Sequence, residues 1–114
     1  MKLFHYEDVK ADEVEGEASK VSIRWLITKE IGAKNFAMRL IEIGPGGHTP
    51  FHKHSWEHEV FILEGEGVIL EDKNEKSFKS GDVIFVPQNE NHQFKNESEK
   101  NVKFLCLIPC DPEK

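Results

Sequence analysis

Three histidines stand close together near the middle of the chain, at His52, His54 and His58 in the segment PFHKHSWEHEV. Side chains alternate between the two faces of a β-strand, so residues of like parity share one face. A turn at Ser55 and Trp56 would interrupt this alternation. Imidazoles buried without a partner cost solvation free energy, and one divalent metal ion would satisfy all three. We therefore expect a metal site here rather than an exposed cluster.

A fourth ligand is expected from the segment GDVIFVPQNENHQFKN. Gly81 begins a predicted strand and Pro87 ends it. Asn89 occupies a tight turn, where a residue tolerant of positive φ is favoured. His92 then opens the next strand, and we expect its imidazole to complete the ligand set.

The elements that must position these histidines are predicted to be all β. From residue 20 onward, short stretches rich in β-branched and aromatic residues alternate with turn-forming residues. No segment has a sustained helical period, and the acidic residues 1–19 are expected to form an arm with at most one helical turn. Residues 20–114 are predicted to form a single domain, either a sandwich or a small jelly-roll barrel.

The first histidine segment resembles the first motif of the cupin superfamily, which has the form G-x5-H-x-H followed by a glutamate and then x6-G. Gly46, His52 and His54 match this motif. Counting back from Gly65 places His58 where the family usually has its glutamate. The resemblance implies that His52, His54 and His58 are metal ligands.

The second histidine segment resembles the second cupin motif, G-x5-P-x-G-x2-H-x3-N. Gly81, Pro87, His92 and Asn96 match it, and Asn89 takes the place of the middle glycine. The resemblance covers residues 35–109 and implies a double-stranded β-helix, the jelly-roll barrel of cupins. The segments FAMRLIEIGPGG, WEHEVFILEG and KFLCLIP are similar to small single-domain bacterial cupins that bind manganese through four histidines.

Glu59 is the alternative to His58, because a one-residue bulge would turn its carboxylate inward. Strand parity and the count from Gly65 both favour His58. With four neutral imidazoles the ion keeps its full charge, which favours anionic ligands, and part of its coordination shell stays open. The resemblance implies Mn(II); imidazole donors also suit Fe(II), Zn(II) and Ni(II).

Three further residues are expected to shape a pocket beside the ion. In NVKFLCLIP, alternation turns Lys103 outward and Phe104 and Cys106 inward. Cys106 is either a small buried apolar residue or part of the reactive pocket. Arg39 is the one charge in the middle of an apolar strand. It is either solvated on the outer face or turned inward, where its guanidinium would bind a carboxylate or an enolate.

Composition restricts the possible partners. The chain has 114 residues, 32% of them charged, and a formal net charge of -6, which argues against nucleic acid and anionic membrane surfaces as partners. It has no apolar run of about 20 residues and no signal-peptide pattern, so a cytoplasmic location is expected.

Cys106 and Cys110 are expected to be reduced thiols. Trp25, Leu26 and Ile27 are apolar on both strand faces, and together with the resemblance they predict a homodimer.

The resemblance implies a metal-dependent dioxygenase or other oxidoreductase that acts on a small organic molecule, with anionic substrates favoured. Two alternatives stay open at this point. One is a metal-dependent isomerase, lyase or cyclase without redox chemistry, and the other is a cupin that binds a small molecule without catalysis. The fold does not distinguish among these functions.

Overall fold

Antiparallel strands make up most of the structure, a computed structural model that describes residues 1–111. Two short 3-10 helices, η1 (Tyr6–Asp8) and η2 (Lys29–Ile31), accompany the strands. The strands are β1 (Asp12–Glu13), β2 (Ser19–Ile27), β3 (Phe36–His48), β4 (His58–Glu64), β5 (Glu66–Leu70), β6 (Glu75–Lys79), β7 (Val83–Val86), β8 (Gln93–Lys95) and β9 (Val102–Pro109). In the described part of the chain, no helix is long and apolar enough to cross a bilayer.

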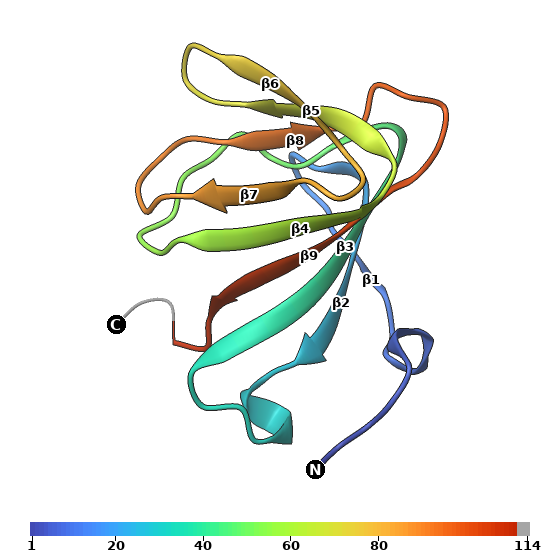
Figure 1. The fold of residues 1–114 in the computed structure, drawn as a ribbon, viewed down its shortest axis with the longest axis vertical. Coiled ribbons are helices and arrows are strands. Elements are labelled where there is room, and N and C mark those ends of the chain that lie inside the picture. Colours follow the sequence, from blue (N-terminus) through green and yellow to red (C-terminus); the bar gives the residue numbers. More distant parts are fainter. Residues whose placement is uncertain (112–114) are drawn as a thin grey trace.

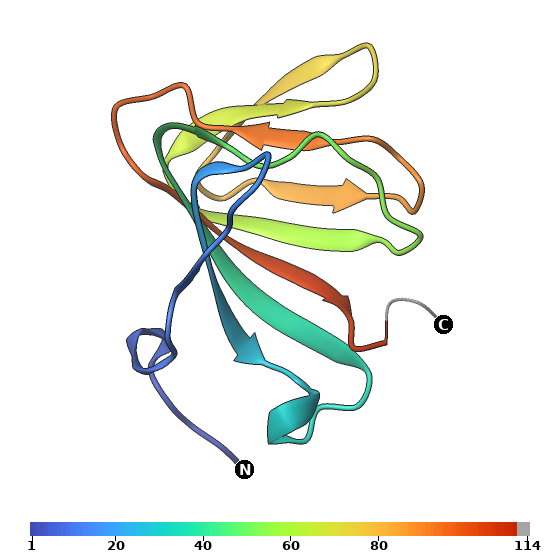
Figure 2. The same ribbon diagram turned by 180° about the vertical axis from the view of Figure 1, so that it is seen from behind.

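The strands form one sheet that curls into a half-barrel (Figures 1 and 2). Its order is β6-β5-β8-β3-β9-β4-β7, with β2 paired to β3 and β1 paired to β2. All the pairings between these strands are antiparallel. The prediction of an all-β jelly roll is confirmed.

The core lies on the concave face, where β3 and β9 run side by side. Burial alternates along β9, with every second side chain inside, as a strand with one covered face requires. Phe104 and Cys106 are both buried, while Lys103 points outward and forms ion pairs with Glu42 and Glu64 at 3.4 and 3.5 Å. The predicted orientation of this strand is confirmed.

The N-terminal residues lie along the β2 edge of the sheet. β1 pairs with β2, and the guanidinium of Arg24 on β2 donates hydrogen bonds to the carbonyl oxygens of Val9 (2.6 Å) and Tyr6 (3.3 Å). The single turn η1 agrees with the one helical turn allowed by the sequence. The domain boundary near residue 20 stays a prediction.

Two turn positions have a positive φ for different reasons. Asn89 has φ of 64°, as predicted for this turn, and its N–H donates to the carbonyl oxygen of His54 at 2.6 Å. Gly65 has φ of 89°, and a Cβ there would collide with the carbonyl oxygen of Asn101. Asn89 therefore connects the turn after β7 directly to the histidine loop.

Candidate metal centre

Backbone pairing, rather than one continuous strand, brings the first histidines to the site. His52 and His92 form an isolated bridge, in which each N–H donates to the other residue's carbonyl oxygen at 3.1 and 2.9 Å. The chain bends at Ser55 and Trp56, and His58 is the first residue of β4. The prediction of one continuous strand through these histidines was therefore wrong, although the predicted alternation of more and less buried side chains continues from His52 through His54 to His58.

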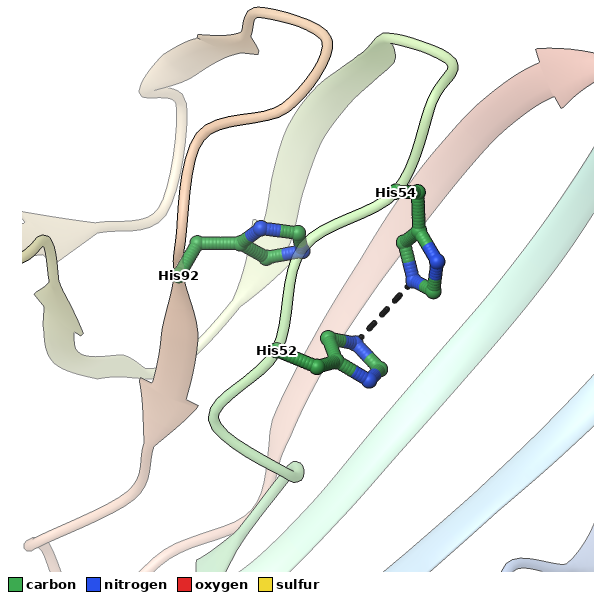
Figure 3. Close-up of side chains that lie close together, drawn as sticks. All are labelled: His52, His54 and His92. Carbon is green, nitrogen blue, oxygen red and sulfur yellow. Dashed lines mark hydrogen bonds between the residues drawn. The ribbon is translucent and has the colours of Figure 1, made fainter.

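Four imidazole rings nevertheless gather in one place. The ligand atoms of His52, His54 and His92 all lie within 4.8 Å of one another (Figure 3). The His58 ring lies outside this tightest group, with its centroid 4.9 Å from that of His92 and 5.2 Å from that of His54. The loop after β3, the first residue of β4 and the residue just before β8 each supply part of the cluster.

His58 has a buried nitrogen without a partner. Its Nε2 makes no hydrogen bond, while its Nδ1 lies 3.3 Å from the Sγ of Cys106. A buried ring nitrogen without a hydrogen bond is costly in a protein interior, and a metal ion would satisfy its lone pair. The neighbouring Glu59 is exposed and pairs in regular register with Phe85 of β7, so no bulge turns its carboxylate inward.

The pKa values of all four clustered histidines are lowered. Burial lowers the pKa of His58 to about 3, and the nearby His92 and Arg39 add to this effect. Burial likewise lowers the pKa of His54 to about 4, and the pKa values of His52 and His92 are also below 6.5, mainly through burial. All four rings are therefore neutral near pH 7, which is the state that binds metals.

One contact each orients the rings of His92 and His54. His92 Nδ1 lies 3.0 Å from the carbonyl oxygen of Glu90, to which it can donate its proton and so leave Nε2 free as a ligand. The Trp56 ring stacks on His54 at 4.3 Å with an interplanar angle of 12°. The contact with Glu90 could not be predicted from the sequence, because the acceptor is a main-chain oxygen, which every residue has.

A cavity of about 140 Å³ adjoins the histidines. Arg39 of β3 lines this cavity. Of the two orientations that the sequence left open for Arg39, the structure therefore has the inward one. Its Nη2 donates to the Sγ of Cys106 at 3.0 Å, its guanidinium lies 5.4 Å over the Trp25 ring, and its Nε is buried without a partner. Within residues 1–111, no carboxylate pairs with this guanidinium. The cavity therefore carries an unneutralised positive charge.

The rest of the cavity wall is mainly apolar and includes residues that the sequence analysis missed. Its apolar side chains are Val14, Val21, Ile23, Ile41, Pro50, Phe94 and Phe104. The alternation of Val21 and Ile23 in β2 could have indicated an inward face. Val14 had no such signal, since it is an isolated apolar residue in an acidic segment whose pairing with β2 depends on the tertiary fold.

A curled antiparallel jelly roll with a histidine cluster beside its internal cavity is the architecture of a cupin. The chain matches the family described as "Cupin domain" over residues 39–108, and it belongs to this family. Among solved structures it is similar to the polyketide cyclase RemF from Streptomyces resistomycificus, with 35% sequence identity and a TM-score of 0.93, over 100% of this chain and 82% of that chain.

Two curated relatives are also similar over most of the chain. The "Oxalate-binding protein" of Thermotoga maritima is 33% identical over 97 residues, which cover 82% of this chain and 78% of the relative. The "1-methylthio-D-xylulose 5-phosphate methylsulfurylase" of Rhodospirillum rubrum is 27% identical over 107 residues, covering 94% and 69% respectively. The relatives thus include both a binding protein and an enzyme.

Proposed function

We propose that this protein is a metal-dependent cupin enzyme that acts on a small anionic organic molecule. His52, His54, His58 and His92 would hold a divalent ion, with Mn(II) the first candidate from the resemblance to four-histidine cupins and Fe(II), Zn(II) and Ni(II) the alternatives. The observation that carries the proposal is the buried, unpartnered Nε2 of His58 beside three converging imidazoles. When bound, the ion would supply Lewis-acid chemistry that polarises a carbonyl or phenolic oxygen.

Arg39 would bind the anionic group of the substrate. Its buried Nε needs a hydrogen-bond acceptor, and a carboxylate or enolate oxygen would satisfy it and neutralise the guanidinium. The apolar wall would exclude water and contact the body of the molecule. A cavity of about 140 Å³ is similar in volume to engineered cavities of about 150 Å³ that accept benzene, so the buried part of the substrate is about the size of one six-membered ring.

The first candidate reaction is an isomerisation, elimination or cyclisation without redox chemistry. The similarity to a polyketide cyclase over the whole chain supports it. The oxygenase reaction expected from the sequence is the second candidate, and the apolar wall beside the histidines supports it because dioxygen is itself an apolar molecule. Substrate conversion with and without dioxygen, followed with an oxygen electrode, distinguishes the two.

A homodimer belongs to the same proposal. The outer face of β4 and β7 carries Phe61, Val83 and Phe85 with 45%, 75% and 57% of their surface exposed. A patch of this kind on a soluble domain favours a protein partner. A second copy of the chain would cover this patch. The cytoplasmic location stays a prediction.

The first experiment is elemental analysis of protein purified without a tag and without added metal. We expect close to one divalent ion per chain, and a sharp loss of that ion in the His58→Ala variant. His48→Ala is the matched control, because His48 is half-buried and hydrogen-bonded to the main chain outside the cavity. Full occupancy in His58→Ala together with loss in Glu59→Ala would contradict the ligand assignment, and a protein that takes up no metal on reconstitution would favour a binding cupin.

A further inference from the structure

Cys106 lies between two nitrogen groups on the inner face of the sheet. Its Sγ accepts a hydrogen bond from Arg39 Nη2 at 3.0 Å and lies 3.3 Å from His58 Nδ1. The two nitrogens are themselves 3.5 Å apart. The register explains the grouping, because Cys106 pairs with Arg39 on β3 and with Val60 on β4, two residues after His58 on the same face.

The protonation pattern of this group is constrained by what each member can do. A guanidinium only donates hydrogen bonds, and a neutral imidazole carries one proton, on either Nδ1 or Nε2. His58 Nε2 is buried and has no acceptor within reach. A proton on Nε2 would therefore lose its hydration without any hydrogen bond in return, whereas a proton on Nδ1 has the sulfur of Cys106 as its acceptor.

We propose that Cys106 is a positioning residue whose sulfur accepts the Nδ1–H of His58 and thereby keeps the Nε2 lone pair free for a metal ion. The inference rests on the four-histidine site proposed above. It assigns the thiol a role that a merely space-filling residue would not have. An acceptor on the ring nitrogen that does not bind the metal fixes the tautomer and orientation of a metal-binding histidine.

Removing the sulfur should do more than leave a gap. In Cys106→Ala, the polar contact that His58 Nδ1 keeps is the Arg39 guanidinium at 3.5 Å, which can only donate. Arg39 would then favour a lone pair on Nδ1 and a proton on Nε2, the opposite of what a metal ligand at Nε2 needs. A second change, Arg39→Met, removes this donor, so the double variant should bind metal better than Cys106→Ala alone.

Two measurements test the inference. The first is two-bond ¹H–¹⁵N correlation NMR of the imidazole groups at pH 7.5, in the 114-residue chain freed of metal by a chelator. We expect the Nδ1–H tautomer of His58 in the wild type and in Cys106→Ser, whose hydroxyl oxygen also accepts, and a shift toward Nε2–H in Cys106→Ala. An Nε2–H tautomer in the wild-type protein would overturn the inference, and this result requires no variant to fold.

The second measurement is the affinity for Mn(II), followed by electron paramagnetic resonance of the free ion. Loss of the hydrogen-bond partner of a metal-binding histidine typically weakens metal binding by about 10- to 100-fold. We expect this for Cys106→Ala, with partial recovery in Cys106→Ser and in Cys106→Ala/Arg39→Met. Cys110→Ala is the control, because Cys110 lies outside the cavity. Equal weakening in the alanine, serine and double variants would indicate packing alone and overturn the inference. If the wild type bound no metal while His58 kept its Nδ1–H tautomer, the proposed function would fail and the tautomer assignment would stand.

Discussion

The Nε2 atoms of His52 and His54 lie only 3.1 Å apart. At this distance both nitrogens cannot carry protons, and two facing lone pairs repel each other. Without a cation the pair shares one proton, as the hydrogen bond in Figure 3 indicates. A divalent ion would accept both lone pairs instead, so the fold holds these side chains in an arrangement that favours binding a cation.

The metal-free protein should become less stable as the pH falls below neutrality. Burial holds the pKa of His58 at about 3 and that of His54 at about 4, against the ordinary value of 6.5. In the unfolded chain these rings take up protons near pH 6.5, while in the folded protein they do not do so until the pH is near 4 or 3. The unfolded state therefore binds more protons in this window, and the free energy of unfolding decreases as the pH is lowered through it.

Urea denaturation of the chelator-treated protein at pH 7, 6 and 5 measures this effect, since most carboxylates stay charged over that range. In the variant His58→Gln, which has no titrating group at this position, the decrease should be smaller. A free energy of unfolding that stays constant from pH 7 to pH 5 would show that the rings are not held neutral by the fold.

The all-β character could be predicted from short-range rules, and the gathering of the four histidines from the resemblance to the two cupin motifs. Alternation in β9 correctly predicted that Phe104 and Cys106 point inward, and turn chemistry correctly predicted the positive φ of Asn89. The motif spacing brought His52 and His92 together in the right fold, although the local conformation around His54 was predicted wrongly.

The parts that could not be predicted depend on contacts between distant segments. Val14 lines the cavity only because β1 pairs with β2, and nothing in its own neighbourhood indicates that pairing. The inward direction of Arg39 is stabilised by Cys106, which is 67 residues further along the chain, and by the Trp25 ring. A charged residue in an apolar strand does not by itself reveal which face is covered.

Removing the charge of Arg39 should weaken the binding of carboxylate ligands. Arg39→Met keeps much of the side-chain volume but removes the donors, and Arg39→Lys keeps the charge without the planar fork. Hydrogen bonds to charged groups contribute about 1.5–3 kcal/mol, so we expect benzoate, as a probe, to bind roughly 10- to 100-fold more weakly to Arg39→Met. Calorimetric titration of metal-loaded protein measures this.

The neutral analogue benzamide is the control for that experiment, because it has a similar shape without the negative charge. Its affinity should change much less between wild type and Arg39→Met. Equal losses for benzoate and benzamide would point to a damaged cavity instead of a lost anion partner. The metal content of each variant, measured in parallel, separates an effect at Arg39 from an effect on the histidines.

A charge on the outer face of β4 and β7 should dissociate the proposed dimer. Val83 and Phe85 are exposed side chains of β7, and Val83 lies opposite Phe61 on β4. Glutamate at either β7 position would bury a charge against apolar surface, so Val83→Glu and Phe85→Glu should elute as monomers in size-exclusion chromatography with light scattering. Phe51→Glu is a matched control, because Phe51 is as exposed as Phe61, at 45%, but lies in the histidine loop. A wild-type protein that is monomeric at high concentration would refute the dimer.

Asn89 should couple the stability of its turn to metal binding. A left-handed conformation costs an ordinary L-residue about 1–2 kcal/mol, more for β-branched side chains, while glycine adopts it freely. With φ of 64° at this position, Asn89→Gly should be close to neutral and Asn89→Val should lower the free energy of unfolding by at least about 1 kcal/mol. Urea denaturation measures the difference, and Gln88→Val at the neighbouring exposed turn position is the control.

The same substitution should also reach the metal site, because the N–H of Asn89 donates to the carbonyl oxygen of His54 at 2.6 Å. If valine shifts the turn to a negative φ, this hydrogen bond is lost and the loop that carries His54 is no longer held against β7. Metal affinity should then fall in Asn89→Val but not in Asn89→Gly or Gln88→Val. A destabilised Asn89→Val protein with unchanged metal affinity would mean that the histidine loop is positioned by the stacking of Trp56 on His54 and by the bridge between His52 and His92, independently of this turn.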